Sequence, residues 1–279
     1  MQALINVNYQ TIPTGFSDLF CCIIRNPIRQ QVSAVFAFQE EYPISDMASI
    51  AVADLAVPFY QPIIGRDHQV KGYEVLARRW EPAQQSYQGI DFASLSEEQS
   101  LHLDIVMLRA IMRDLPTLAK GGPYFLSINL NPTLNSPTYQ NLLLLVLMQA
   151  RKLGIEIWFE VLEQAPLQRQ HRALIEVLRS HGAHIACDDF GTLECNFQRM
   201  LALPYEVIKL DRSLLLQASK TPHALRMLTG LVEYLQRLGM KVVCEGVETL
   251  QHIEIANRLG CDYQQGYAYA MPSPLSRWA

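Results

Sequence analysis

The chain has 279 residues, of which 49% are hydrophobic and 18% are charged, a balance typical of a globular protein. This length can build one large α/β barrel or two small domains. The formal net charge of −4 provides no general attraction to a nucleic-acid backbone, so the composition argues against DNA or long RNA as a partner.

The first 56 residues differ from the rest of the chain. Their most apolar stretch, Leu19–Ile24, ends shortly before Pro27, and no residue pattern there indicates chemistry. We expect residues 1–56 to form an N-terminal extension of unknown role and residues 57–279 to form the main domain. The chain contains no internal repeat and no low-complexity tract.

Strand-like and helix-like segments alternate from Val57 onward. Short β-rich runs cover residues 57–64, 73–80, 124–131, 155–163, 184–191, 207–211, 241–247 and 263–270. Helical patterns cover residues 96–118, 138–153, 168–181, 222–238 and 250–259. This alternation predicts parallel strands joined by helical crossovers. Eight strands in this length favour a closed (β/α)₈ TIM-type barrel, although periodicity alone leaves an open sheet as the alternative.

The predicted helices carry their own start and stop signals. The first has an apolar face formed by Leu101, Ile105, Leu108, Met112 and Leu115, and the four others are followed by a glycine. Ser96 and Gln99 have the spacing of a capping box at the start of the first predicted helix, residues 96–118.

Membrane and compartment signals are absent from the sequence. No run of about 18 apolar residues occurs, so we expect no membrane-spanning helix. The first ten residues lack the features of a signal peptide. The six cysteines form no Cys-x-x-Cys pair and no zinc-type cluster, and a chain of this size does not need disulfides. These observations predict reduced thiols and a cytoplasmic protein.

Polar residues that a hydrophobic core would exclude recur near the carboxyl ends of the predicted strands. They are Glu74, Arg78, Asn129, Glu160, Asp188, Asp189, Lys209, Glu245 and Gln265. In a barrel, the loops at these strand ends build the active site. Each residue alone has an ordinary explanation: Asp189 could cap a helix, and Lys209 could be a rim charge with a buried stem. Their joint occurrence points to a common site.

Five of these residues are acids, and five converging carboxylates would be costly unless cations neutralised them. Oxygen ligands with one amide favour Mg²⁺ or Mn²⁺ over zinc. The adjacent residues Asp188 and Asp189 could hold two ions roughly 3.5–4 Å apart, the arrangement used for in-line attack on phosphodiesters.

Seven segments together resemble, in order and spacing, the motifs of the EAL family of cyclic di-GMP phosphodiesterases. They are YQPII…GYEVLARRW, INLNP, FEVLEQ, ACDDFGT, LPYEVIKLDRSLL, CEGVETLQ and GCDYQQGYAYAMPSP. The resemblance covers the chain from about Val57 to Pro274. It implies a barrel whose first strand can run against the others, and hydrolysis of cyclic di-GMP to linear pGpG. It also implies two Mg²⁺ or Mn²⁺ ions per site and a homodimer.

The resemblance assigns roles to individual residues. The implied metal ligands are Glu74, Asn129, Glu160 and Asp188, with Asp189 for a second ion. Substrate would be bound by Gln61 and Arg78. The attacking water would be served by Lys209, Glu245 and Gln265. Glu248 would brace the loop that follows Asp189.

The sequence departs from the family pattern at four places. Val75 replaces the alanine of the signature, and Leu162 replaces a hydroxyl residue. The family's N-x-S reads Asn129-Leu130-Asn131. The loop after the fifth strand has Leu193, Glu194 and Cys195 where the family has glycine, an aromatic residue and serine. If the loop needs a positive φ at position 193, leucine adopts it only with strain.

Two functional hypotheses follow. Non-catalytic relatives usually lose a metal ligand or the lysine, and all of these residues are present, which favours an active phosphodiesterase. The altered loop supports the alternative, a regulator that binds cyclic di-GMP or a protein without hydrolysis.

Cys187 and Cys244 each precede an acid, so strand alternation predicts that they face the helices as packing residues.

Overall fold

A computed structural model describes residues 56–122, 124–131, 136–162, 169–192 and 203–278, which belong to one compact unit, Ile44–Ala279. The departures from the family pattern at residues 193–195 lie outside the described residues. The strands are β1 (Ala56–Gly65), β2 (Val70–Glu81), β3 (Ser86–Gly89), β4 (Phe125–Asn129), β5 (Glu156–Leu162), β6 (His184–Phe190), β7 (Val207–Leu210), β8 (Lys241–Cys244), β9 (Tyr263–Gln264) and β10 (Ser273–Pro274). The helices are η1 (Phe92–Ser94), α2 (Glu97–Gly121), α3 (Pro137–Lys152), α4 (Arg169–Ser180), α6 (Arg212–Lys220), α7 (Pro222–Arg237), α8 (Leu250–Leu259) and η2 (Leu275–Arg277).

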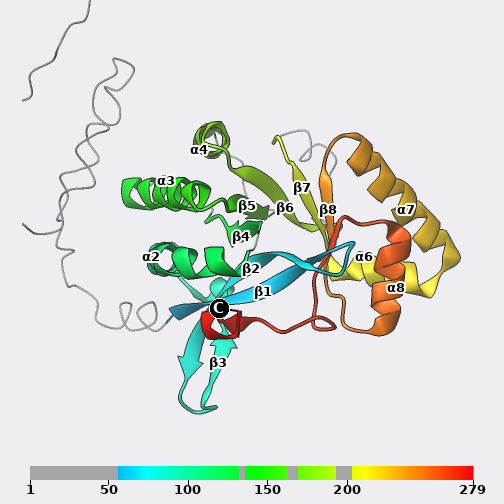
Figure 1. Cartoon of the computed structure of the whole chain (residues 1–279), viewed down its shortest axis with the longest axis horizontal. Helices are drawn as coiled ribbons and strands as arrows, with labels where there is room; N and C mark the ends of the chain where they lie inside the picture. The colour runs from blue at the N-terminus through cyan, green and yellow to red at the C-terminus, as the bar shows by residue number, and fades with distance from the viewer. Residues whose placement is uncertain (1–55, 123, 132–135, 163–168, 193–202, 279) are drawn as a thin grey trace, which may run out of the picture. The chain divides into compact units, whose positions relative to one another are not determined.

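Strand pairing closes the sheet into a barrel (Figure 1). Strands β2, β4, β5, β6, β7, β8 and β9 follow one another in parallel. Strand β1 runs antiparallel to both β2 and β9, with Gln61 opposite Glu74 and Ile64 opposite Gln264. Because β1 joins the two ends of the parallel set, the open-sheet alternative is excluded. The predicted (β/α)₈ barrel and its reversed first strand are both confirmed.

The predicted helices form within a residue or two of their expected bounds, apart from the end of α2. The Ser96–Gln99 capping box is present at its start, because each side chain bonds the other residue's backbone N–H. The helix continues past the predicted end at residue 118 and stops at Gly122, whose φ of 76° suits glycine. Within the described parts of the chain, no helix is long and apolar enough to cross a membrane.

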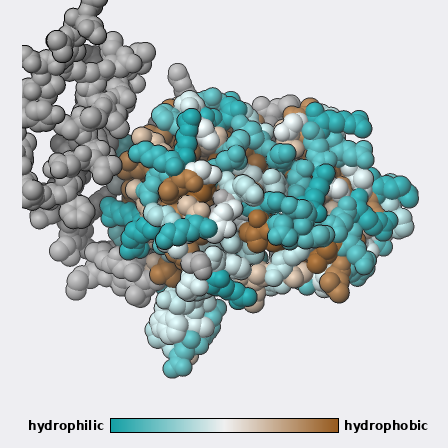
Figure 2. Space-filling view, viewed as in Figure 1, coloured by the Kyte–Doolittle hydropathy of each residue, from teal (hydrophilic) through white to brown (hydrophobic). Residues whose placement is uncertain are grey.

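Helix α6 and strand β3 are among the elements that were not predicted from the sequence. Helix α6 follows β7 immediately, and its N-cap is Asp211, which bonds the Ser213 backbone N–H. A hairpin joins β2 to β3 and projects from the barrel (Figure 1). Trp80 and Tyr87 pack edge to face across it at 5.1 Å, yet both remain partly exposed. Figure 2 shows the hairpin in pale and hydrophilic colours, without a brown patch.

The barrel interior has an apolar floor made by one side chain from each of several strands. These side chains are Ile63, Phe125, Trp158, Ala186, Val207 and Val243. Phe125 stacks on Trp158 with ring centroids 3.5 Å apart. Gly72 leaves room for this stack, since a Cβ there would lie 2.4 Å from the Phe125 ring. Side chains alternate along a strand, so the residue two positions beyond each floor residue also faces the interior.

Candidate active site

A buried lysine lies at the centre of the polar layer above the apolar floor. Lys209, two residues beyond Val207 on β7, is only 1% exposed. Its Nζ lies 2.8 Å from a carboxylate oxygen of Glu160 and 2.9 Å from oxygens of both Asp188 and Glu245. Glu74 is further away, at 3.7 Å. Strand alternation therefore brings four of the predicted acids to one cation, as the sequence suggested.

The charges in this group are strongly coupled. Burial by itself lowers the pKa of Lys209, but the surrounding carboxylates, Asp188 foremost, hold it well above the usual range. Burial raises the pKa of Glu160, and it raises that of Glu245 to about 8, against the attraction of Lys209. One ammonium group cannot neutralise four carboxylates, so the site favours additional protons or additional cations.

The acids fit a hard divalent ion. Ligand oxygens of Asp188, Asp189 and Glu245 lie within 4.8 Å of one another. In the described part of the chain, Glu160 Oε2 is buried and has no hydrogen-bond partner, while its Oε1 accepts from the Ser127 hydroxyl at 2.5 Å. An orphaned carboxylate oxygen beside a set of oxygen donors is the chemistry that Mg²⁺ or Mn²⁺ requires.

Asp189 differs from the other acids because its backbone has a φ of 55° and its side chain is exposed. Although the residue is exposed overall, partial desolvation of its carboxyl group and the neighbouring carboxylate of Asp188 raise the pKa of Asp189. Left-handed backbone in a residue other than glycine is uncommon and gathers at functional sites. This turn directs two adjacent aspartates to the same site, which alternation along a regular strand would have separated.

Two glutamine side chains hold Glu74 in place. Gln265 Nε2 donates to Glu74 Oε2 at 2.5 Å and also to Gln61 Oε1 at 3.3 Å. Gln61 in turn donates to the backbone carbonyl of Ala270 at 3.3 Å. Both glutamines are buried, at 7% exposure for Gln61 and 4% for Gln265. The two residues therefore position Glu74 across the junction of β1, β2 and the β9 end.

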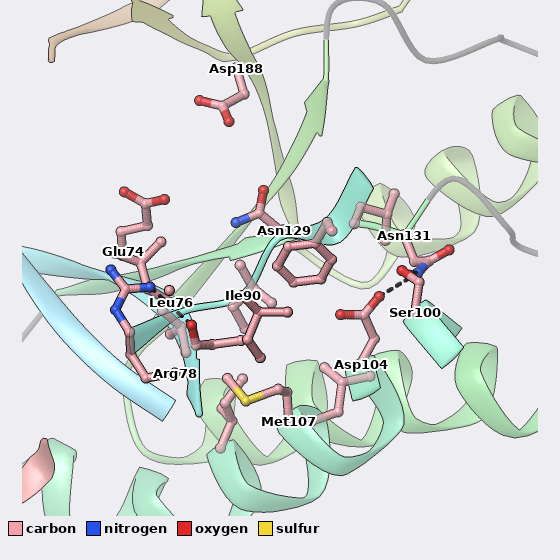
Figure 3. A pocket seen from close by; sticks show the side chains of 18 of the residues that line it. Glu74, Leu76, Arg78, Ile90, Ser100, Asp104, Met107, Asn129, Asn131 and Asp188 are labelled. Atoms are coloured by element: carbon pink, nitrogen blue, oxygen red, sulfur yellow. Dashed lines mark hydrogen bonds between the residues drawn. The ribbon is translucent and has the colours of Figure 1, made fainter. Parts of the chain in front are cut away.

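A cavity of about 510 Å³ opens beside the acids. Glu74, Asn129 and Asp188 line one end of it, together with Arg78. Figure 3 shows Ser100, Asp104 and Asn131 at the other end, with Ile90 and Met107 between the two ends. The Arg78 guanidinium donates to the Ala77 carbonyl at 2.9 Å. An elongated ligand with an anionic part and a polar far end matches this lining.

The far end of the cavity was missed by sequence reasoning. Asp104 lies on the apolar face of α2, between Leu101 and Leu108 at helical spacing, and burial raises its pKa to about 7. The Asn131 side-chain amide donates to Asp104 at 2.5 Å and to the Ser100 hydroxyl at 2.9 Å. A carboxylate on the apolar face of an amphipathic helix was the signal that could have identified this group.

The remaining predicted residues lie at the edge of the site or behind it. Glu248 forms an ion pair with Arg212 at 2.7 Å, and the loop that it was expected to brace lies outside the described residues. Cys187 and Cys244 are buried in the core outside the barrel floor, as strand alternation predicted. Neither of them forms a disulfide in the described part of the chain, and the same holds for Cys261.

The fold and the site define a (β/α)₈ barrel with a buried acidic cluster at the carboxyl ends of its strands, where barrel enzymes carry their chemistry. The EAL domain family profile matches residues 48–272, and the chain belongs to this family.

Curated relatives and a solved structure agree with this membership. The Probable cyclic di-GMP phosphodiesterase PdeG of Escherichia coli strain K12 is 28% identical over 224 residues, which cover 77% of this chain and 44% of that protein. Cyclic di-GMP phosphodiesterase NbdA of Pseudomonas aeruginosa strain PAO1 is 31% identical over 226 residues, covering 78% of this chain and 29% of NbdA. The chain thus spans less than half the length of either relative. The Bacillus subtilis YkuI protein, solved with substrate c-di-GMP and calcium, matches with a TM-score of 0.67 at 25% identity, covering 80% of this chain and 57% of that one.

Proposed function

We propose that this chain hydrolyses cyclic di-GMP to linear pGpG with the help of Mg²⁺ or Mn²⁺. The observation that carries the proposal is the buried lysine among four carboxylates, two of which, Glu74 and Asp188, line a cavity of about 510 Å³. The curated relatives PdeG and NbdA are both named cyclic di-GMP phosphodiesterases, which supports the same substrate.

The chemistry divides among the residues of the barrel mouth. Glu74, Asn129, Glu160 and Asp188 would hold one divalent ion, and Asp189 a second. Bound ions of this kind supply Lewis acidity and lower the pKa of water. Asp189 and Asp188 lie close enough together for the two-ion arrangement, which we include in the proposal.

The protein's own side chains would direct the attack on phosphorus. Glu245, with a pKa raised to about 8, is suited to accept the proton of the attacking water. Lys209 would neutralise charge that develops on the phosphoryl oxygens. Arg78 would hold a phosphate, and Gln61 and Gln265 would keep Glu74 aligned. The water oxygen would bond to phosphorus as the bond from phosphorus to one ribose 3′ oxygen breaks. The proton released by the water would be balanced by protonation of that 3′ oxygen from solvent, and a 5′-phosphate would remain on the linear product.

The far end of the cavity suits a guanine base. The Watson–Crick edge of guanine presents two adjacent N–H donors, and an ionised carboxylate can accept both. Asp104 accepts a hydrogen bond from Asn131 at Oδ2 and lines the cavity. We therefore assign Asp104 to base recognition.

A binding protein without turnover is the second candidate, because residues 193–195 depart from the family pattern. The complete set of acids around Lys209 favours hydrolysis over binding alone. Incubation with cyclic di-GMP and Mg²⁺ or Mn²⁺, followed by chromatography, separates the two. Formation of pGpG by the natural protein, and none by Glu74→Ala, is the expected result. Cyclic di-GMP that stays bound to the protein but is not converted to pGpG would favour the binding protein.

Further parts of the proposal concern the cell and the assembly. Cys187, Cys244 and Cys261 are buried and form no disulfide in the described residues, which suits a reducing cytoplasm. A homodimer remains an expectation from the family resemblance, and sedimentation of the full chain would test it. We keep residues 1–56 as a separate extension and residues 57–279 as the barrel domain, and deletion of the extension would test this division.

A further inference from the structure

Asn131 is one of the positions where the sequence departs from its family pattern, and the assignments above give it no role. It follows β4 and is only 5% exposed. Its backbone N–H donates to the Tyr139 hydroxyl at 2.9 Å, which fixes the main chain. Its side-chain amide donates to Ser100 and Asp104 on α2. The residue therefore links β4, α2 and α3 at the far end of the cavity (Figure 3).

The contact with Asp104 influences the charge of that carboxyl. Burial raises the pKa of Asp104 to about 7, and the hydrogen bond from Asn131 opposes this rise by favouring the ionised form. The other titratable groups that line the cavity are Glu74 and Arg78 on β2, Asp188 on β6 and Tyr139 on α3. Asp104 in turn raises the pKa of Tyr139, beyond the larger effect of burial, so that hydroxyl stays neutral.

The two forms of a carboxyl recognise different purines. An ionised carboxylate accepts two hydrogen bonds and so matches the paired N–H groups of guanine. The same edge of adenine presents the N1 acceptor beside the N6 donor, so an ionised carboxylate faces one repulsive contact. A protonated carboxyl donates one hydrogen bond and accepts another, and it therefore matches adenine. The charge of a carboxyl at this position consequently decides which base is favoured.

We infer that Asn131 is a positioning residue that holds Asp104 in the orientation and the ionised form that select guanine over adenine. The inference rests on the proposed function, because it assumes that the cavity accepts a cyclic dinucleotide. Asn131 has no part in bond cleavage: its effect belongs to binding and base choice, whereas Lys209 and the acids govern turnover.

The test is binding of cyclic di-GMP and cyclic di-AMP, measured by calorimetry with the full chain in calcium buffer from pH 5.5 to 9. Chromatography verifies that the ligands remain intact. The natural protein should prefer cyclic di-GMP more strongly as the pH rises through about 7. Asn131→Ala should reduce that preference about tenfold near pH 7 and should move the midpoint upward by about one pH unit, because a charge-assisted hydrogen bond is lost.

Two further variants make the result specific. Asn141→Ala, at a partly exposed position of α3 outside the cavity lining, is the matched control and should leave the preference unchanged. Asp104→Asn carries an amide, which can donate and accept as adenine requires, and should reverse the preference at all pH values. This variant also decides the matter if Asn131→Ala fails to fold.

The outcomes separate the two proposals. If the natural protein binds neither dinucleotide, the proposed substrate is wrong and the inference falls with it. If it binds cyclic di-GMP but Asn131→Ala keeps the same preference and the same midpoint, only the inference is overturned. The inference is also overturned if the preference for cyclic di-GMP over cyclic di-AMP does not change with pH and Asp104→Asn does not reverse it. Asp104 would then not select the base.

Discussion

Replacement of Lys209 by methionine should destabilise the metal-free protein more than any surface substitution. Lys209 is 1% exposed, and its ammonium group lies 2.8–2.9 Å from three carboxylates, with Glu74 at 3.7 Å. Methionine fills a similar volume but carries no charge. The substitution therefore leaves the acids facing one another above the apolar floor, without a cation between them.

The magnitude follows from the loss of one partner in a buried ionic group. Removal of one partner from a buried ion pair typically costs roughly 3–5 kcal/mol, because the remaining charge stays buried without compensation. Proton uptake by the carboxylates limits the loss, since burial already raises the pKa values of Glu160 and Glu245. We expect a decrease of about 3 kcal/mol in the free energy of unfolding, against a total of roughly 5–15 kcal/mol for a typical domain.

Urea denaturation in excess chelator at pH 7.5 measures this difference. The matched control is Lys241→Met, which makes the same replacement at an exposed position of β8 and should change stability by less than about 0.5 kcal/mol. Addition of Mg²⁺ or Mn²⁺ should restore part of the stability of Lys209→Met. An ion present at 100 times its dissociation constant contributes about 2.7 kcal/mol. Equal stability of Lys209→Met and Lys241→Met in chelator would refute the reasoning, because it would mean that the acids need no cation.

Three more outcomes are expected. Asp104→Asn should stabilise the protein at pH 8 but not at pH 4 in urea titrations. Because folding raises the pKa of Asp104 from 3.8 to about 7, the free energy of unfolding of the natural protein falls as the pH rises through this range, by at most roughly 4 kcal/mol. A difference that is the same at both pH values would contradict this. Glu74→Ala should abolish pGpG formation while the thermal unfolding midpoint stays within a few degrees of the natural protein, and a collapse of the fold would show that Glu74 is structural. Chelator should abolish turnover, Mg²⁺ or Mn²⁺ should restore it, and the larger Ca²⁺ should inhibit it; full activity in chelator would exclude a metal requirement.

The barrel and its charged centre could be predicted because strand alternation is rigid. Once β7 was located, Lys209 had to share a side with Val207, and the same rule fixed Glu160 above Trp158 and Glu245 above Val243. The closure by β1 and the exact partners of Lys209 depend on the tilt and stagger of the strands, which periodicity does not encode.

Short or polar elements escaped prediction for physical reasons. Helix α6 begins at Arg212, directly after β7, so Asp211 was assigned to the strand although it caps the helix. Strand β3 is only four residues long, and its sequence, SYQG, has no alternating apolar pattern. It is stabilised by pairing with the end of β2, and that pairing cannot be read from the short segment itself.

The base-recognition end of the cavity was missed because its residues are distant in sequence and belong to different kinds of element. Ser100 and Asp104 lie on α2, whereas Asn131 follows β4, and only the folded chain brings them together. The sequence marked Asn131 as a departure from the family pattern, but its partner could not be named before the fold was known. A departure of this kind becomes interpretable only through the contact that it makes.

The separation of the two ends of the cavity bears on the choice between an enzyme and a binding protein. Strands of the barrel hold Lys209 and the acids, whereas α2 and the residue after β4 hold the base-recognition group. A substitution among the acids around Lys209 is therefore expected to alter turnover while base-specific binding persists. Binding of cyclic di-GMP alone thus does not demonstrate catalysis in this chain, and loss of catalysis would not abolish recognition. The two activities have to be measured in the same protein, because the fold allows each to be lost without the other.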